Sequence, residues 1–120
     1  MEAINSGTME KPSVKVFYDG NILKEKDFAD ILLGIEEEGI PYDVQAMPTS
    51  DVLELAKKAS DSSRIGVGVG VSKEGVALQY EKLDITTPVF RIKYYQTNLF
   101  RVIGANAARL VKKMPFKSLE

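Results

Sequence analysis

Glycine alternates with β-branched residues in the segment IGVGVGV, residues 65–71. Strict alternation predicts a β-strand, and glycine at every second position leaves one face of that strand without side chains. A helix or another backbone can approach such a face closely, so we expect a layered fold built against it. Contact with a bound ligand is the other interpretation. A dinucleotide or phosphate loop is not indicated, because its glycines would lie in a turn between a strand and a helix.

Segments with apolar residues at helical spacing alternate with further short strands. The predicted strands are residues 14–18, 42–46, 65–71, 76–79 and 89–93, and the predicted helices are residues 23–38, a segment from Ser50 or Asp51 to the loop at 60–63, and residues 98–113 with Thr97 or Asn98 as cap. Helical crossovers favour parallel strands, whereas the short turn at 72–75 forces antiparallel pairing. We therefore predict one three-layer α/β domain over residues 14–117, preceded by a flexible leader at 1–13.

The composition excludes several classes of function. The 120 residues include no cysteine and no histidine, which excludes thiol nucleophiles, zinc sites and triads built on an imidazole base. A net charge of −1 without a basic stripe argues against nucleic acid as a partner. No apolar run is long enough for a membrane span, and the N-terminus lacks the features of a signal peptide, so we expect a cytoplasmic protein. No pair of carboxylates is placed for catalysis, and we expect a non-catalytic chain.

Three glutamates end the first predicted helix at its unfavourable end. Glu36, Glu37 and Glu38 stand directly before the stop signal at 39–41, where the helix macrodipole is negative and disfavours carboxylates. At about 100° per residue, Glu36 and Glu38 lie on the flanks of the apolar stripe and Glu37 lies nearly opposite it. Two interpretations are open. The run is a solvated acidic face, or its carboxylates meet a cation that another molecule brings.

Aromatic residues gather around the last predicted helix. Tyr94 and Tyr95 leave a strand together and cannot both point inward, and tyrosine is enriched at protein interfaces, so we predict interface roles for them and for Phe100. Within the helix, Gly104 lowers the intrinsic propensity by about 1 kcal/mol, which a close contact with the sheet would explain. The sequence offers no structural reason for Asn106.

Four segments, taken in order, resemble one known family. They read VKVFYDG, LLGIEEEGIPYDVQ, SRIGVGVGVSKEGVAL and RVIGANAARLVKKMPF. Together they resemble the small subunit of the reactivating factor of adenosylcobalamin-dependent diol and glycerol dehydratases, over about residues 13–117. The resemblance implies a five-stranded mixed sheet in the order 2-1-3-4-5 with strand four antiparallel, as in anticodon-binding domains, and similar to the medium subunit of the dehydratase.

The resemblance also implies a function and partners. Such small subunits pair with a large ATPase subunit in an assembly of two large and two small chains, which uses ATP to release damaged cobalamin from the inactivated dehydratase. The small subunit leaves, and the large one docks on the dehydratase in its place. The family string GLEE, a polar residue and G-V-P corresponds to residues 34–41, which implies that Glu37 is a ligand to magnesium or calcium beside the ADP or ATP of the large subunit. Glu36 and Glu38 are then expected at the same interface.

Two other functions remain open at this point. One is the medium subunit of the dehydratase, which is typically longer at its N-terminus. The other is a stand-alone ligand-binding module, which predicts a monomer. The leader could hold an address for a bacterial microcompartment, and the sequence does not distinguish a glycerol from a propanediol dehydratase as client.

Overall fold

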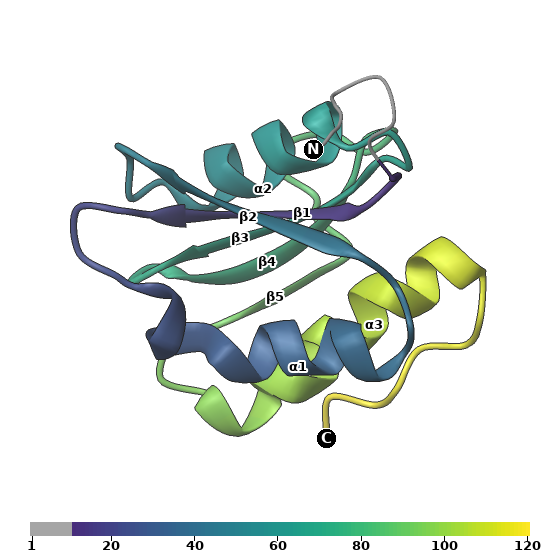
Figure 1. Cartoon of the computed structure of the whole chain (residues 1–120). Helices are drawn as coiled ribbons and strands as arrows, with labels where there is room; N and C mark the ends of the chain where they lie inside the picture. The colour runs from purple at the N-terminus through teal and green to yellow at the C-terminus, as the bar shows by residue number, and fades with distance from the viewer. Residues whose placement is uncertain (1–10) are drawn as a thin grey trace, which may run out of the picture.

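Five strands form one sheet in the order β2-β1-β3-β4-β5, with helices on both faces (Figure 1). The computed structural model describes residues 11–120. Its strands and helices are β1 (Val14–Asp19), α1 (Ala29–Glu37), β2 (Tyr42–Met47), α2 (Val52–Ser62), β3 (Val67–Ser72), β4 (Gly75–Tyr80), β5 (Phe90–Ile92) and α3 (Phe100–Lys112). The three-layer α/β fold predicted from the sequence is confirmed.

Strand pairing follows the length of the connections. β1 pairs in parallel with β2 and with β3, because a helix separates each strand from the next along the chain. β4 is antiparallel to β3, since a tight turn joins these two strands, and it is also antiparallel to β5. The register places Val16 between Val44 on one side and Val69 on the other. One reversed strand in an otherwise parallel sheet agrees with the prediction.

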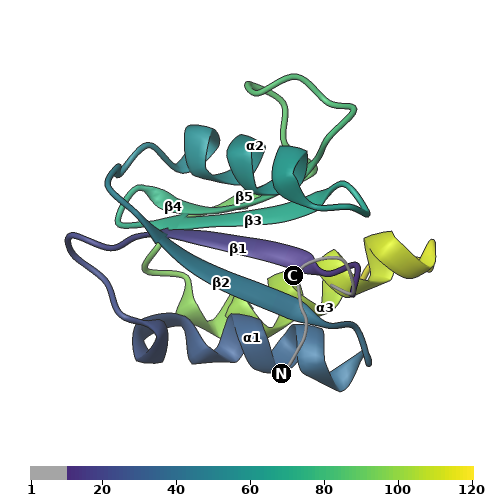
Figure 2. The same cartoon turned by 45° about the horizontal axis from the view of Figure 1, so that its top comes forward.

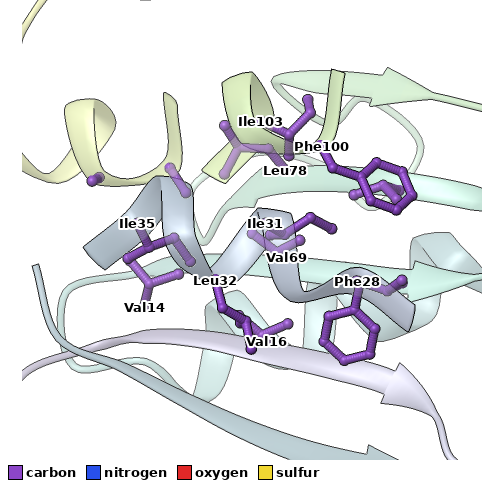
Figure 3. Packing of buried hydrophobic residues seen from close by; sticks show 14 of the residues in the cluster. Val14, Val16, Phe28, Ile31, Leu32, Ile35, Val69, Leu78, Phe100 and Ile103 are labelled. Atoms are coloured by element: carbon purple, nitrogen blue, oxygen red, sulfur yellow. The ribbon is translucent and has the colours of Figure 1, made fainter. Parts of the chain in front are cut away.

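The two faces of the sheet are covered unequally. α2 lies alone on one face, and α1 and α3 lie together on the other (Figure 2). The α2 face has a small core that includes Phe17, Leu55 and Ala59. The larger core lies between the sheet and the pair α1 and α3 (Figure 3), and among its buried side chains are Val14, Val16, Phe28, Ile31, Leu32, Ile35, Val69, Leu78, Phe100 and Ile103.

The glycines of β3 let α2 lie directly against the strand. A methyl group at Gly68 would overlap the backbone nitrogen of Ser60, and one at Gly70 would lie 2.5 Å from the backbone nitrogen of Ala56. Neither distance is possible for a real side chain, so the bare face of this strand is filled by helix backbone. Close packing, not ligand contact, explains glycine at positions 68 and 70. Gly66 lies in the turn before β3, outside the strand that we predicted to begin at residue 65, and its φ of 74° favours glycine.

α1 and α3 also cross at glycines. A methyl group at Gly34 would overlap the carbonyl oxygen of Arg101, and one at Gly104 would overlap the carbonyl oxygen of Ile31. The expectation of a close contact at Gly104 is confirmed, but its partner is wrong, because the glycine faces helix α1 and not the sheet. The crossing brings the end of α1 onto the first turns of α3.

The starts of two helices differ from the prediction. The 3₁₀ helices Glu25–Phe28 and Thr97–Leu99 precede α1 and α3. Neither Thr97 nor Asn98 caps α3, because both lie inside that 3₁₀ helix and the N-cap position is Leu99, without a side-chain bond. Asp51 does cap α2, and its Oδ1 accepts hydrogen bonds from the backbone nitrogens of Leu53 and Glu54, each at 3.1 Å.

The packed part of the chain includes the residue before β1. Ser13, which we placed in the leader, is buried, and its hydroxyl donates to Asp43 at 2.8 Å while its carbonyl accepts from Ser63 Oγ at 2.7 Å. Of the rest of the predicted leader, Lys11 and Pro12 are exposed and outside any helix or strand, and residues 1–10 lie outside the described part of the chain. Over residues 11–120, no helix has the length and apolar character needed to cross a membrane.

Candidate functional site

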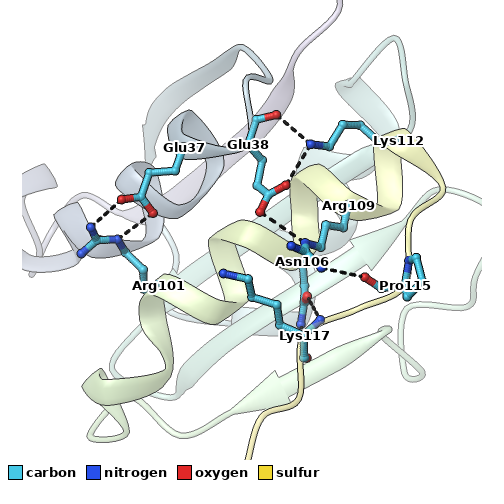
Figure 4. A network of polar contacts seen from close by, with 8 residues as sticks. All are labelled: Glu37, Glu38, Arg101, Asn106, Arg109, Lys112, Pro115 and Lys117. Atoms are coloured by element: carbon cyan, nitrogen blue, oxygen red, sulfur yellow. Dashed lines mark hydrogen bonds and ion pairs between the residues drawn. The ribbon is translucent and has the colours of Figure 1, made fainter.

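Glu37 of α1 and Arg101 of α3 form a bidentate ion pair (Figure 4). Arg101 Nε donates to Glu37 Oε1 at 3.1 Å, and Arg101 Nη2 donates to Glu37 Oε2 at 2.6 Å. Glu37 is the last residue of α1 and Arg101 lies in the first turn of α3, so each charge opposes the macrodipole of its own helix. In the free chain the cation beside Glu37 comes from α3, an arrangement that neither of the two interpretations of the sequence included.

Glu38 is held by two cations from the last turn of α3. Lys112 Nζ donates to Glu38 Oε1 at 2.8 Å and Arg109 Nε donates to Oε2 at 3.2 Å. Lys112 also donates to the backbone carbonyl of Glu38 at 2.9 Å, which satisfies an unpaired acceptor at the end of α1. The Glu38 side chain is only 14% exposed. Its structural role is to tie the two helices together.

Glu36 differs from its two neighbours. Its side chain is exposed, and in the part of the chain that the structure describes it forms no hydrogen bond or ion pair. Of the three glutamates, only Glu36 corresponds to the simple solvated face that the sequence allowed.

The ion pairs keep both bonded glutamates charged. Hydrogen bonds from Arg101 lower the pKa of Glu37, and hydrogen bonds from Lys112 and then Arg109 lower the pKa of Glu38. The same pair raises the pKa of the Arg101 guanidinium. The Glu37 side chain is 55% exposed and that of Arg101 is 49% exposed, so water competes for the Glu37 pair far more than for the Glu38 contacts.

The chain can offer one oxygen ligand for a metal here, but not a complete site. Within residues 11–120, no group of three or more acidic side chains is arranged so that it could hold a metal ion. Magnesium and calcium prefer carboxylate and carbonyl oxygens, and the half-exposed Glu37 carboxylate has that chemistry. Glu37 therefore fits the role of a single ligand whose companions come from elsewhere.

Asn106 anchors the C-terminal tail, a role that the sequence did not reveal. Its side chain is fully buried, its Nδ2 donates to the carbonyl of Lys117 at 3.0 Å, and its Oδ1 accepts from the backbone nitrogen of Lys117 at 2.7 Å (Figure 4). Phe116 then packs edge-on against Phe90, with ring centroids 5.1 Å apart. The one signal of this contact in the sequence is an asparagine among the apolar residues of the last helix.

The aromatic residues predicted at an interface separate into three environments. Tyr95 is 75% exposed. Tyr94 is partly buried against Phe100, at 5.9 Å between ring centroids, and the ammonium group of Lys73 lies 4.6 Å from the Tyr94 ring centre. Phe100 is 2% exposed and belongs to the core, so the structure corrects the prediction of a surface contact for Phe100. The expectation that the two tyrosines point differently is confirmed.

Comparison with known proteins shows the family. The model of the family described as dehydratase medium subunit matches residues 11–117. The small subunit of the propanediol dehydratase-reactivating factor of Citrobacter freundii is 46% identical over 91 residues, which are 75% of this chain and 78% of that protein. The chain belongs to the family of reactivating-factor small subunits.

Solved structures of reactivating factors share the fold of this small subunit. A chain of a diol dehydratase-reactivating factor complexed with ADP and Mg²⁺ has a TM-score of 0.83 and 33% identity, over 91% of this chain and all of that one. A chain of a glycerol dehydratase reactivase has a TM-score of 0.85 and 28% identity, over 92% of this chain and all of that one. The family and fold predicted from the sequence are confirmed. The term small subunit also implies a large-subunit partner, and a non-catalytic role agrees with these relatives.

Proposed function

We propose that this chain is the displaceable docking subunit of an ATP-dependent reactivating factor. It binds a large ATPase subunit in an assembly of two large and two small chains, which releases damaged cobalamin from inactivated diol or glycerol dehydratase. The observation that carries the proposal is the 46% identity to a named reactivating-factor small subunit. When the small subunit leaves, the large subunit docks on the dehydratase in its place.

The fold supports a subunit that can leave intact. The large core between the sheet and the pair α1 and α3 is made of side chains of this chain alone, and its residues are buried without a partner, each at most 7% exposed. A subunit with its own closed core can dissociate without exposing that core to water. Reversible docking then costs only the surface contacts with the large subunit.

The glycine-rich strand of this chain does not form a phosphate-binding loop. Its glycines are covered by α2 backbone, so the strand cannot surround a phosphate. We therefore place ATP hydrolysis on the large subunit. The ADP and Mg²⁺ of the related complex support a nucleotide and a metal in such an assembly.

Glu37 is the residue of this chain that we assign to the metal. Its carboxylate is a half-exposed oxygen donor at the end of α1, and the large subunit and nucleotide would supply the other ligands to magnesium or calcium. The metal, when bound, offsets phosphate charge. Glu36 and Tyr95, both exposed, are the other surface contacts that we propose. Glu38 contributes by holding α1 against α3.

A second function is favoured by the description of the matching family model, dehydratase medium subunit. A chain of this fold would then assemble with the large and small subunits of the dehydratase, and contact cobalamin as part of the enzyme. The two functions differ in the partner that this chain binds.

A mixing experiment separates these functions. The chain is combined either with the cognate reactivase large subunit or with the dehydratase large and small subunits, and each mixture is run on size exclusion with and without ATP and magnesium. We expect a stable complex with the reactivase subunit that ATP loosens. Assembly only with the dehydratase subunits would support the second function, and a monomer in both mixtures would contradict both.

A further inference from the structure

We propose that Arg101 is a releasable counter-ion for Glu37, which moves to Asp30 when a divalent cation in the large subunit takes an oxygen of Glu37. The inference rests on the proposed function, since it assumes that Glu37 meets the cation. Arg101 would regulate metal binding at Glu37, and Asp30 would be the second carboxylate that makes this regulation reversible.

The geometry places Arg101 between two carboxylates of the same helix. Asp30 and Glu37 are seven residues apart, so they lie on one face of α1, two turns from each other. Arg101 Nη2 is 2.6 Å from Glu37 Oε2, and Arg101 Nη1 is 3.8 Å from Asp30 Oδ1. The first contact is a short hydrogen bond, while the second is too long for one but within ion-pair range. The guanidinium is thus shared unequally, with a second carboxylate already within reach.

The exposure of the three side chains allows the exchange. Asp30 is 57% exposed, a value close to those of Glu37 and Arg101, and ion pairs at this exposure add little to stability because water replaces them readily. Glu38, beside Glu37 in the chain, is bound by two cations and mostly covered. Glu38 therefore holds the ends of the two helices together, whereas the ion pair of Glu37 can break.

Metal binding gives a reason for the exchange. Both Glu37 oxygens accept hydrogen bonds from Arg101 in the free chain, and a divalent cation on the same carboxylate repels the guanidinium. Asp30 lets Arg101 stay paired after it leaves Glu37. The free subunit then never exposes an unpaired Glu37 carboxylate, and the bound subunit never leaves Arg101 without an anion.

The test is a magnesium titration of assembly with the cognate large subunit and ADP. We measure the magnesium concentration that gives half-maximal binding for the wild type and for Arg101→Met, which keeps the aliphatic stem. Removing the competing cation should lower this concentration about two- to fivefold, the range expected for an exposed ion pair. Asp30→Asn should raise it, since Arg101 loses its second partner. Lys58→Met on α2, with the same change of charge in the other helical layer, should leave it unchanged.

The outcomes separate the inference from the function on which it rests. If Glu37→Ala abolishes the magnesium dependence but Arg101→Met leaves the midpoint unchanged or higher, the proposed metal role stands and the counter-ion exchange is wrong. If Glu37→Ala has no effect, the metal role itself fails, and the exchange with it. An equal shift for Lys58→Met would show an effect of net charge and overturn the exchange. If Arg101→Met does not fold, Arg101→Lys provides the test, because a lysine cannot make the bidentate pair and the midpoint should still fall.

Discussion

Glu37 and Arg101 each lie at the helix end whose macrodipole disfavours their charge, and the two side chains form an ion pair that offsets both charges. The last turn of α1 contains no basic residue and the first turn of α3 contains no acidic one. The Gly34 and Gly104 crossing brings these two ends together. The two charges, each unfavourable at its own helix end, therefore form one favourable contact between the helices. The same contact occupies the carboxylate that we assign to the metal.

A fall in pH should destabilise the wild type more than it destabilises the Glu38→Gln variant. The pKa of Glu38 is lowered in the folded chain from its ordinary value of 4.5 by Lys112 and Arg109. A lowered folded-state pKa adds stability that is complete above the unfolded value and is lost as pH falls through the folded value. Urea unfolding midpoints measured from pH 7 to pH 3 check this. Glu36→Gln is the matched control, because Glu36 has no ion pair among residues 11–120, and parallel curves for all three proteins would contradict the prediction.

Gly104→Ala should destabilise the chain by about 3 kcal/mol or more. The added methyl group would overlap the Ile31 carbonyl oxygen, and a backbone atom in a packed helix cannot move aside at low cost. Chemical unfolding monitored by circular dichroism gives the free energy. Gly39→Ala is the contrast, since a methyl group there meets nothing within 4 Å but the backbone has a φ of 80°, which costs about 1–2 kcal/mol. A smaller loss for Gly104→Ala than for Gly39→Ala would be inconsistent with the close helix crossing.

Asn106→Ala should release the C-terminal tail. The amide makes both polar contacts that hold the Lys117 backbone, and losing a buried hydrogen-bonding group costs about 1–3 kcal/mol. We expect faster amide hydrogen exchange at Lys117 together with a lower unfolding free energy. Asn98→Ala, at an exposed asparagine, should stay within about 0.5 kcal/mol of wild type. Unchanged exchange at Lys117 would show that the tail is held by other contacts.

The sequence predicted the fold well because its signals are local. The alternating glycines of β3 and the Asp51 cap depend on residues within one element or next to it, and both agree with the structure. The partners of the glutamates could not be predicted, because Arg101 is 64 residues from Glu37 along the chain. Their pairing depends on how two helices cross.

Dependence on tertiary packing also explains the other differences between the prediction and the structure. Asn106 lacked an explanation because its partner is the backbone of a tail without periodicity, 11 residues further on. Phe100 was grouped with surface aromatics by its neighbours in sequence, whereas burial depends on which face of α3 meets the sheet. The metal role that we propose for Glu37 came from the family resemblance, and geometry alone does not imply it.

Tyr95→Ala should weaken binding to the large subunit without changing stability. The ring is three-quarters exposed, so its removal should alter the unfolding free energy by less than about 0.5 kcal/mol. A tyrosine at the centre of an interface contributes a tenfold or larger effect on affinity. Surface plasmon resonance with immobilised large subunit measures it. Ile85→Ala removes another exposed apolar side chain as a control, and equal losses for the two variants would remove Tyr95 from the proposed interface.

The most direct test of reversible docking is the dissociation constant between this chain and the cognate large subunit, measured with ADP and with ATP at fixed magnesium. The account predicts tight binding with ADP, weaker binding with ATP, and a loss of the magnesium dependence for Glu37→Ala. The same constant with both nucleotides, or no binding to the large subunit at all, would contradict it.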